Sequence, residues 1–132
     1  MNEVLDTRFF AVHLTSSDPA LQKKTRDRLL ALRRDRRGLL PSVVIAETVN
    51  LICRALGRRP AEEEHRKLLQ SGLKVVPVDA DLAKTAGILR CQHRQVPLAD
   101  CMVAAVGIRE SATVISDDPH FEEVSGLRVA WL

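Results

Sequence analysis

The chain has 132 residues, of which 45% are hydrophobic and 28% are charged; this balance excludes a disordered chain and predicts one globular domain over residues 1–132. No apolar run approaches the ~20 residues that a membrane-spanning helix needs, and no signal peptide is recognisable, so a cytoplasmic protein with no membrane partner is expected. The three cysteines lack CxxC spacing and lie in apolar helical patterns, which predicts buried free thiols rather than a disulfide framework.

Basic residues gather in two stretches, although the formal net charge is only +3. Residues 23–37 hold the larger group, and Arg54, Arg58 and Arg59 form the smaller one. Positive clusters of this kind attract phosphate backbones. A solvated helix face explains a single basic run equally well.

The first third of the chain predicts one strand and two helices. Residues 2–6 form a short strand, and a helix follows to about Leu14. Asp18 and Pro19 then supply an N-cap and a first helical residue, which predicts a second helix that reaches about Arg36.

Residues 39–41 predict a very short strand that leads into a helix over 42–56, with Ser42 as its cap. That helix is apolar nearly all round, which is typical of a buried helix. Pro60, followed by the glutamates at 62–64, predicts the start of another helix, because early acidic residues complement the helix dipole.

Residues 74–78 predict the next strand, with Pro77 marking its end or a sheet edge. A helix from Asp79 to about His93 follows, and residues 99–110 then predict a second buried helix.

Two further strands are predicted at 112–116 and 127–131. Strands that alternate with helices imply right-handed crossovers and a mostly parallel sheet, so the fold class is α/β. Ligands of such sheets bind beyond the carboxyl ends of the strands. Asp6 and the segment 116–118 follow two of these ends.

Each of the four acidic residues that stand out has an ordinary structural explanation. Asp6 and Asp100 could cap helices or complement their dipoles, and Asp118 lies in a turn. Glu47 is harder to explain in this way, because its neighbours are almost all apolar. Burying an unpaired carboxylate costs roughly several kcal/mol, so this group needs a cation, hydrogen-bond donors or an opening to water.

Taken together, the four acids indicate a metal site. Carboxylates that meet repel one another unless a hard cation neutralises them, and Mg²⁺ and Mn²⁺ prefer oxygen ligands. A cation held in this way can promote phosphodiester hydrolysis, which agrees with the basic stretches.

Four segments in order carry a resemblance to the PIN-domain family, especially the VapC-like toxin ribonucleases. They are VLDTRFF at 4–10, PSVVIAETVNLI at 41–52, VPLADCMVAA at 96–105 and VISDDPHF at 114–121. The resemblance implies a three-layer α/β/α sandwich with a central, mostly parallel sheet. It also implies a Mg²⁺- or Mn²⁺-dependent endoribonuclease, a hydrolase acting on RNA phosphodiester bonds.

Carried over by position, the family pattern gives four residues that are both catalytic and metal-binding: Asp6, Glu47, Asp100 and Asp118. Ser116 and Thr7 would support them with hydroxyl groups. The adjacent Asp117 leaves the choice of the fourth acid open between Asp117 and Asp118.

The resemblance also implies partners. It points to an RNA substrate, a homodimer and a cognate antitoxin that covers the site, as in a type II toxin–antitoxin pair. The basic stretch at 19–37 is the candidate contact for RNA backbone or for an acidic antitoxin segment.

Other functions stay open at this point. A receiver-like phosphotransfer domain would want paired acids near the first strand and a Lys after a late strand, whereas Asp6 has no acidic neighbour and Ser116 is followed by Asp117. A non-catalytic PIN-like module for RNA or protein binding would fail to bind metal, and a nuclease outside toxin–antitoxin systems would process RNA. The histidines have no zinc-type spacing, and His120 is best explained as an ordinary turn residue.

Overall fold

Five parallel strands form the central sheet of the computed structural model, which describes residues 1–132. Their order across the sheet is β3-β2-β1-β4-β5. The strands are β1 Glu3–Leu5, β2 Gly38–Pro41, β3 Lys74–Val76, β4 Thr113–Ile115 and β5 Arg128–Ala130. The predicted parallel α/β sheet is therefore confirmed, and β3, which precedes Pro77, lies at an edge as expected.

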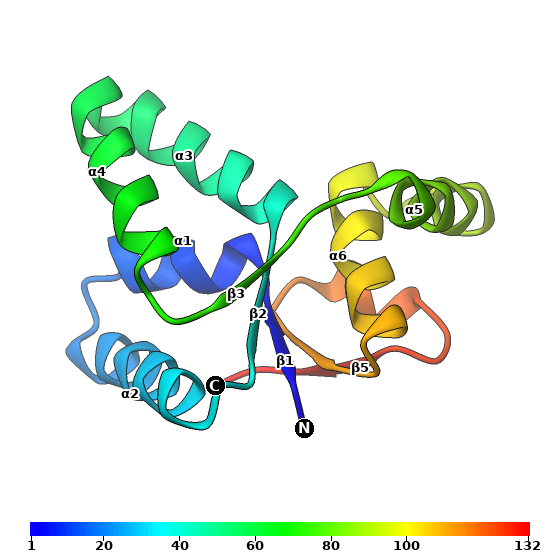
Figure 1. Ribbon diagram of the computed structural model, residues 1–132, viewed down its shortest axis with the longest axis horizontal. Helices are drawn as coiled ribbons and strands as arrows, with labels where there is room; N and C mark the ends of the chain where they lie inside the picture. The colour runs from blue at the N-terminus through cyan, green and yellow to red at the C-terminus, as the bar shows by residue number, and fades with distance from the viewer.

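Six α-helices and one 3₁₀ helix surround this sheet. They are α1 Thr7–Thr15, α2 Pro19–Asp35, α3 Ser42–Leu56, α4 Arg58–Leu69, α5 Ala80–Gln92, α6 Leu98–Arg109 and the 3₁₀ helix η1 Pro119–Glu123. In Figure 1 the helices α1 to α4 lie on the left of the strands, while α5 and α6 lie on the right. None of the helices has the length and apolar character that crossing a membrane requires.

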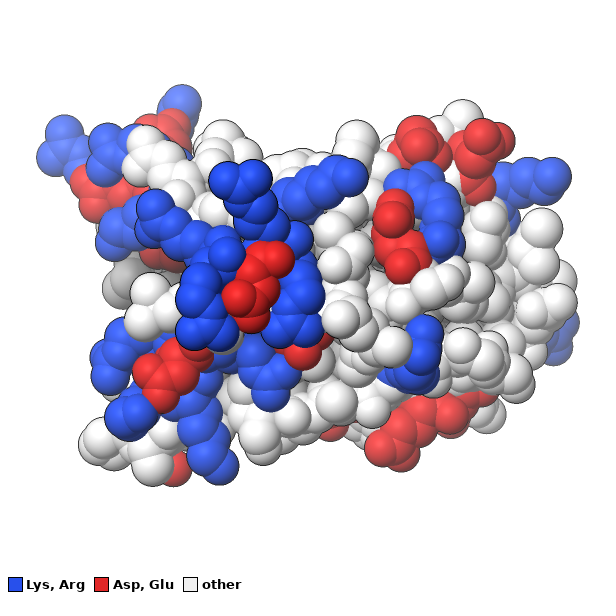
Figure 2. Space-filling model, turned by 60° about the horizontal axis from the view of Figure 1, so that its bottom comes forward, with Lys and Arg blue, Asp and Glu red and all other residues white.

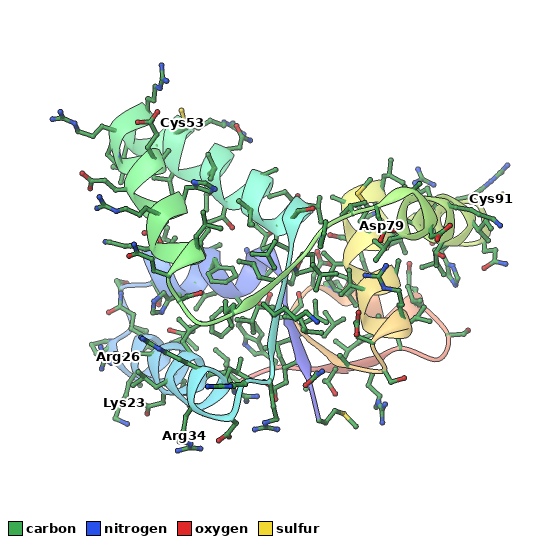
Figure 3. The ribbon with its side chains drawn as sticks, viewed as in Figure 1. Lys23, Arg26, Arg34, Cys53, Asp79 and Cys91 are labelled. Carbon is green, nitrogen blue, oxygen red and sulfur yellow. The ribbon has the colours of Figure 1, made fainter.

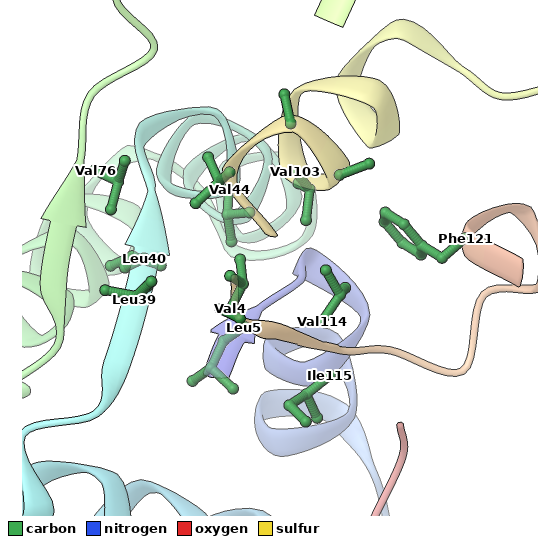
Figure 4. Close-up of a cluster of buried hydrophobic side chains, with 14 of the residues drawn as sticks. Val4, Leu5, Leu39, Leu40, Val44, Val76, Val103, Val114, Ile115 and Phe121 are labelled. Atoms are coloured by element: carbon green, nitrogen blue, oxygen red, sulfur yellow. The ribbon is translucent and has the colours of Figure 1, made fainter. Parts of the chain in front are cut away.

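Buried side chains on both faces of the sheet explain this three-layer arrangement. Val4 and Leu5 are consecutive, so their side chains point to opposite faces, yet both are 0% exposed. A strand can bury both faces only if helices cover both of them. In the core, strand residues such as Val114 pack with helical residues such as Val44 and Val103 (Figure 4).

Strand order also fixes where a site can form. The chain runs from β1 to β2 and β3 on one side, then crosses over to β4 and β5 on the other side of β1. The carboxyl ends of β1 and β4 therefore lie next to each other at the point where the direction of strand addition reverses. This is the place where parallel α/β sheets bind ligands.

Two predicted helix starts are wrong. Ser42 does not cap α3: it is the first helical residue, and its Oγ accepts a hydrogen bond from the backbone N–H of Val78 at 3.0 Å. Helix α4 begins at Arg58 rather than at Pro60, so the glutamates at 62–64 lie beyond its first turn. At α3 a contact with the segment after β3 engages the hydroxyl group that the local signal assigned to a cap.

Two predictions of burial are also wrong. Helix α3 buries only one stripe, which consists of Val44, Thr48 and Ile52, and its opposite face is exposed. Of the three free cysteines only Cys101 is buried, whereas Cys53 and Cys91 are exposed near the outer ends of α3 and α5 (Figure 3). Apolar neighbours in the sequence did not predict burial here, because the outer faces of these helices meet no other element.

Candidate metal centre

Four different elements bring the four candidate acids to the carboxyl edge of the sheet. Asp6 directly follows β1 and caps α1, and Asp118 follows β4 and caps η1. Glu47 lies in α3, which starts where β2 ends, and Asp100 lies in the first turn of α6. The ordinary structural explanations also hold: Asp6 and Asp118 cap helices, and Asp100 lies in a first turn. The same positions face the site.

Asp6 is the most deeply placed of the four, with only 2% of its surface exposed. Its Oδ2 accepts a hydrogen bond from the Oγ of Ser116 at 2.8 Å and one from the backbone N–H of Arg8 at 3.4 Å. Burial raises the pKa of Asp6 above its ordinary value, and Glu47 raises it further.

Glu47 is held by a hydroxyl group from the first residue of α1. Thr7 Oγ1 donates a hydrogen bond to Glu47 Oε1 at 2.7 Å, which ties α3 to the start of α1. Both residues line a groove of about 270 Å³, together with Asn50 and Arg54. Asn50 and Arg54 follow Glu47 by three and seven residues, so they share its face of α3.

Asp100 lies in the combined field of the other three acids. Its pKa is raised to about 6, first by burial and then by the negative charges of Asp6, Asp118 and Glu47, while His120 lowers it. No lysine or arginine side chain forms an ion pair with any of the four acids. The site therefore gathers negative charge that no paired lysine or arginine neutralises.

Asp117 and Asp118 have different surroundings. Asp117 is exposed and accepts two hydrogen bonds from the guanidinium of Arg8, at 2.9 and 3.3 Å. The Oδ1 of Asp118 lies 3.0 Å from the Nδ1 of His120. Asp118 therefore faces the acid cluster, and Asp117 faces a cation outside it, so the geometry favours Asp118 as the fourth acid.

His120 is a member of the cluster that sequence reasoning missed. Its Nδ1 lies 3.3 Å from Asp100 Oδ2, as well as close to Asp118. One ligand atom from each of these three residues lies within 4.8 Å of the others. The signal was the Asp-Pro pair at 118 and 119, which begins η1 and turns the next residue back toward the capping carboxylate.

Comparison with known proteins adds the family. A family model described as PIN domain matches residues 4–127. The chain belongs to the PIN-domain family. No curated protein gave a match to this PIN domain.

Solved structures resemble this PIN domain over nearly its whole length. A chain of the DNA-bound VapBC complex from Salmonella typhimurium has 18% identity and a TM-score of 0.80, with coverage of 99% of this chain and 98% of that chain. A chain of VapBC2 from Rickettsia felis, bound to a promoter DNA fragment, has 18% identity and a TM-score of 0.78, with coverage of 100% of this chain and 99% of that chain. VapC20 from Mycobacterium tuberculosis, a toxin that cleaves the sarcin–ricin loop, has 23% identity and a TM-score of 0.74, with coverage of 96% of each chain. At these low identities the likeness is one of fold.

The donor set of this PIN domain fits a divalent cation. Carboxylate oxygens are ligands that Mg²⁺ and Mn²⁺ prefer. Burial and then repulsion raise the pKa of Asp100, and a cation among the four acids would relieve the repulsion. The hydroxyl groups of Ser116 and Thr7 each leave one carboxylate oxygen of Asp6 and Glu47 without a side-chain hydrogen bond.

The long basic stretch ends at the opposite edge of the sheet. The side chain of Arg37 donates to the backbone carbonyl of Met1, and Glu3 N–H donates to the carbonyl of Arg37, so these residues lie at the amino end of β1. Lys23 and Arg34 project outward from α2 and pair with nearby acids of the same helix (Figure 3). Figure 2 shows lysines and arginines gathered on this side of the molecule, with acidic groups between them.

Proposed function

We propose that this PIN domain is a Mg²⁺- or Mn²⁺-dependent endoribonuclease that hydrolyses RNA phosphodiester bonds. The observation that carries the proposal is the meeting of four carboxylates with no lysine or arginine paired to any of them. The raised pKa of Asp100 shows that its charged form is destabilised in the folded protein, and a bound cation would stabilise that form. Membership of the PIN-domain family supports nuclease chemistry.

Each residue then has a task. We assign Asp6, Glu47, Asp100 and Asp118 to hold the cation, which supplies Lewis-acid chemistry toward the phosphodiester when it is bound. Ser116 orients Asp6 through its 2.8 Å hydrogen bond, and Thr7 orients Glu47 through its 2.7 Å hydrogen bond. These hydroxyl groups hold the carboxylates in one geometry before substrate arrives, which is the positioning that catalysis needs.

Substrate contacts follow from the groove beside Glu47. Arg54 lines it and forms no ion pair within the protein, so its guanidinium is free for a phosphate. The basic surface on α2 lies at the other edge of the sheet and is proposed to contact more distant RNA backbone or an acidic antitoxin segment. Contacts of this kind add affinity without reading sequence.

We further propose that the protein is the toxin of a type II toxin–antitoxin pair, that it forms a homodimer, and that a cognate antitoxin covers its site. The support is the likeness of the fold to chains of VapBC complexes. Growth arrest on induced expression of the wild type, and none with Asp100→Asn, is expected. A nuclease of general RNA processing would cleave RNA in vitro without arresting growth, and light scattering after size-exclusion chromatography reports the dimer.

The deciding experiment is cleavage of a set of structured RNAs by purified wild type, Asp100→Asn and Glu63→Gln. A sarcin–ricin-loop RNA belongs in the set, because a toxin of similar fold cleaves that loop. Glu63 is an exposed acid on α4 without an ion-pair partner, so Glu63→Gln is the matched control for loss of one negative charge. Each protein is assayed with Mg²⁺, with Mn²⁺ and with EDTA.

Metal-dependent cuts by wild type and Glu63→Gln, absent from Asp100→Asn, are the expected result. Equal cutting by Asp100→Asn would refute the assignment of the site. If the wild-type protein cleaves none of the RNAs, its binding of Mg²⁺ and Mn²⁺ is measured by calorimetric titration. Failure of the wild type to bind either ion would favour the non-catalytic binding module.

A further inference from the structure

The imidazole of His120 has an unusual position at the edge of the acid cluster. Asp118 caps η1 by accepting a hydrogen bond from the backbone N–H of His120 at 3.0 Å. The same cap holds the ring beside the cluster, with Nδ1 3.0 Å from Asp118 Oδ1 and 3.3 Å from Asp100 Oδ2. The side chain as a whole is 39% exposed, yet Nδ1 itself is buried.

That nitrogen has no hydrogen-bond partner despite its short distances to two carboxylates. Buried polar atoms in proteins nearly always have a partner, so an unpaired one needs an explanation. The two nearby oxygens lie close enough for an ion pair, but the atoms do not adopt the geometry of a hydrogen bond. A group that binds the nitrogen and both carboxylates at once would satisfy all three.

A single cation has the right size for this role. Ligand atoms from Asp100, Asp118 and His120 all lie within 4.8 Å of one another. Metal–ligand bonds of about 2.0–2.2 Å place two ligands of one ion up to about 4.4 Å apart. The two distances from His120 Nδ1, 3.0 Å to Asp118 Oδ1 and 3.3 Å to Asp100 Oδ2, lie within that range.

The other two acids differ in this respect. Asp6 and Glu47 each accept a hydrogen bond from a hydroxyl group, from Ser116 and Thr7 respectively. The centre thus has two parts. Asp6 and Glu47 offer only oxygen atoms, whereas Asp100 and Asp118 flank the Nδ1 atom of His120.

We propose that His120 Nδ1 is a direct ligand of the cation that Asp100 and Asp118 hold, and that the site therefore selects a divalent transition-metal ion such as Mn²⁺ over Mg²⁺. This inference rests on the metal centre of the proposed function and adds its metal specificity. Imidazole nitrogen is a ligand of first-row transition-metal ions, and among these Mn²⁺ also favours carboxylate oxygens, whereas Mg²⁺ is bound almost entirely by oxygen ligands and water. Neutral imidazole with Nδ1 unprotonated and Nε2 protonated is the tautomer that binds in this way.

The test uses Mn²⁺ as a paramagnetic probe. Electron spin echo envelope modulation of Mn²⁺ bound to wild type should show a ¹⁴N coupling from a coordinated imidazole. Labelling the protein with ¹⁵N-histidine should replace that coupling by the ¹⁵N pattern, and this arm needs no variant to fold. In His120→Gln the coupling should vanish, and in the control His65→Gln, an exposed histidine of α4, it should persist.

Metal affinities measured by calorimetry give the second readout. His120→Gln should weaken Mn²⁺ binding at least about tenfold, the scale on which ligand-sphere changes act. Mg²⁺ binding should change by less than about threefold, so the preference for Mn²⁺ falls with the substitution. A histidine that only orients the carboxylates would weaken both ions alike.

Two results would overturn the inference, and they are distinguishable. Bound Mn²⁺ without a histidine-nitrogen coupling, or with one that persists in His120→Gln, shows a metal centre in which His120 is not a ligand. Wild type that binds neither Mn²⁺ nor Mg²⁺ removes the metal centre itself, and the proposed function falls with it.

Discussion

Replacing Asp100 by Asn should make the metal-free protein more stable at neutral and alkaline pH. The carboxyl of Asp100 is largely buried, with 15% of the side chain exposed, and three other acids raise its pKa. Asn removes the negative charge and keeps nearly the same shape. A substitution that abolishes the proposed activity would therefore stabilise the fold.

The magnitude follows from the pKa of Asp100, which rises from 3.8 to about 6 on folding. This rise corresponds to about 3 kcal/mol, at about 1.4 kcal/mol for each pKa unit. Because the folded-state pKa is above the unfolded one, the protonated group favours the fold below pH 3.8, and that stability is lost as pH rises through about 6. Asp100→Asn should thus gain up to about 3 kcal/mol at pH 8 and little below pH 4.

The assay is urea unfolding of wild type, Asp100→Asn and Glu63→Gln in EDTA, followed by circular dichroism at several pH values from 4.5 to 8. The difference between wild type and Asp100→Asn should grow across this range. The exposed Glu63 control should stay within about 0.5 kcal/mol of wild type at every pH. Added Mg²⁺ or Mn²⁺ should stabilise wild type and narrow its gap to Asp100→Asn, because a ligand of the folded state adds stability.

Asp100→Asn that is no more stable than wild type at pH 8 would refute the claim that burial and the neighbouring carboxylates raise the pKa of Asp100. A gain that does not change with pH would refute it too, because it would show that repacking, and not charge, is responsible.

Three further substitutions test individual contacts by urea unfolding. Ser116→Ala removes the hydrogen bond that Ser116 Oγ donates to Asp6 and the one that it accepts from Asp118 N–H, so it should lower the free energy of unfolding by about 1–3 kcal/mol. Unchanged stability would mean that these bonds contribute nothing. Thr48→Val replaces a buried hydroxyl that has no partner by a methyl group, which should raise stability by about 1 kcal/mol; a loss would point to an unrecognised partner of that hydroxyl. Arg36 at the end of α2 has a left-handed backbone conformation with φ of 54°, which glycine adopts without strain. Arg36→Gly should therefore raise the free energy of unfolding by about 1 kcal/mol. A lower unfolding midpoint would show that the backbone at Arg36 is not strained.

Local signals in the sequence determined most of the elements of this protein. The Asp18-Pro19 pair begins α2 in the structure, as its capping chemistry predicts, and the side chain of Asp18 accepts from Ala20 N–H. The apolar run before Ser116 gives β4, and Pro77 closes β3 at the sheet edge. These signals depend on interactions among a few neighbouring residues, so they do not depend on how the rest of the chain packs.

The candidate site was reachable from the sequence only in part. Alternation of strands and helices places Asp6 and Ser116 at strand ends, and the apolar surroundings of Glu47 single it out. The family resemblance gives the four acids their shared role, and the pairing of β1 with β4 comes from the structure. The choice between Asp117 and Asp118 needed the structure, because adjacent residues in a turn point in different directions. One of them meets the guanidinium of Arg8, and the other meets the imidazole of His120.

Tertiary structure alone decided which faces are buried and where the charges lie. Cys53 and the outer face of α3 are exposed because no element covers them, although their sequence neighbours are apolar. The basic end of α2 lies at the amino edge of the sheet because it leads directly into β2. The sequence determines the polarity of each residue along the chain, but the field at Asp100 arises from the carboxylates of Asp6, Glu47 and Asp118, which meet only when the sheet forms.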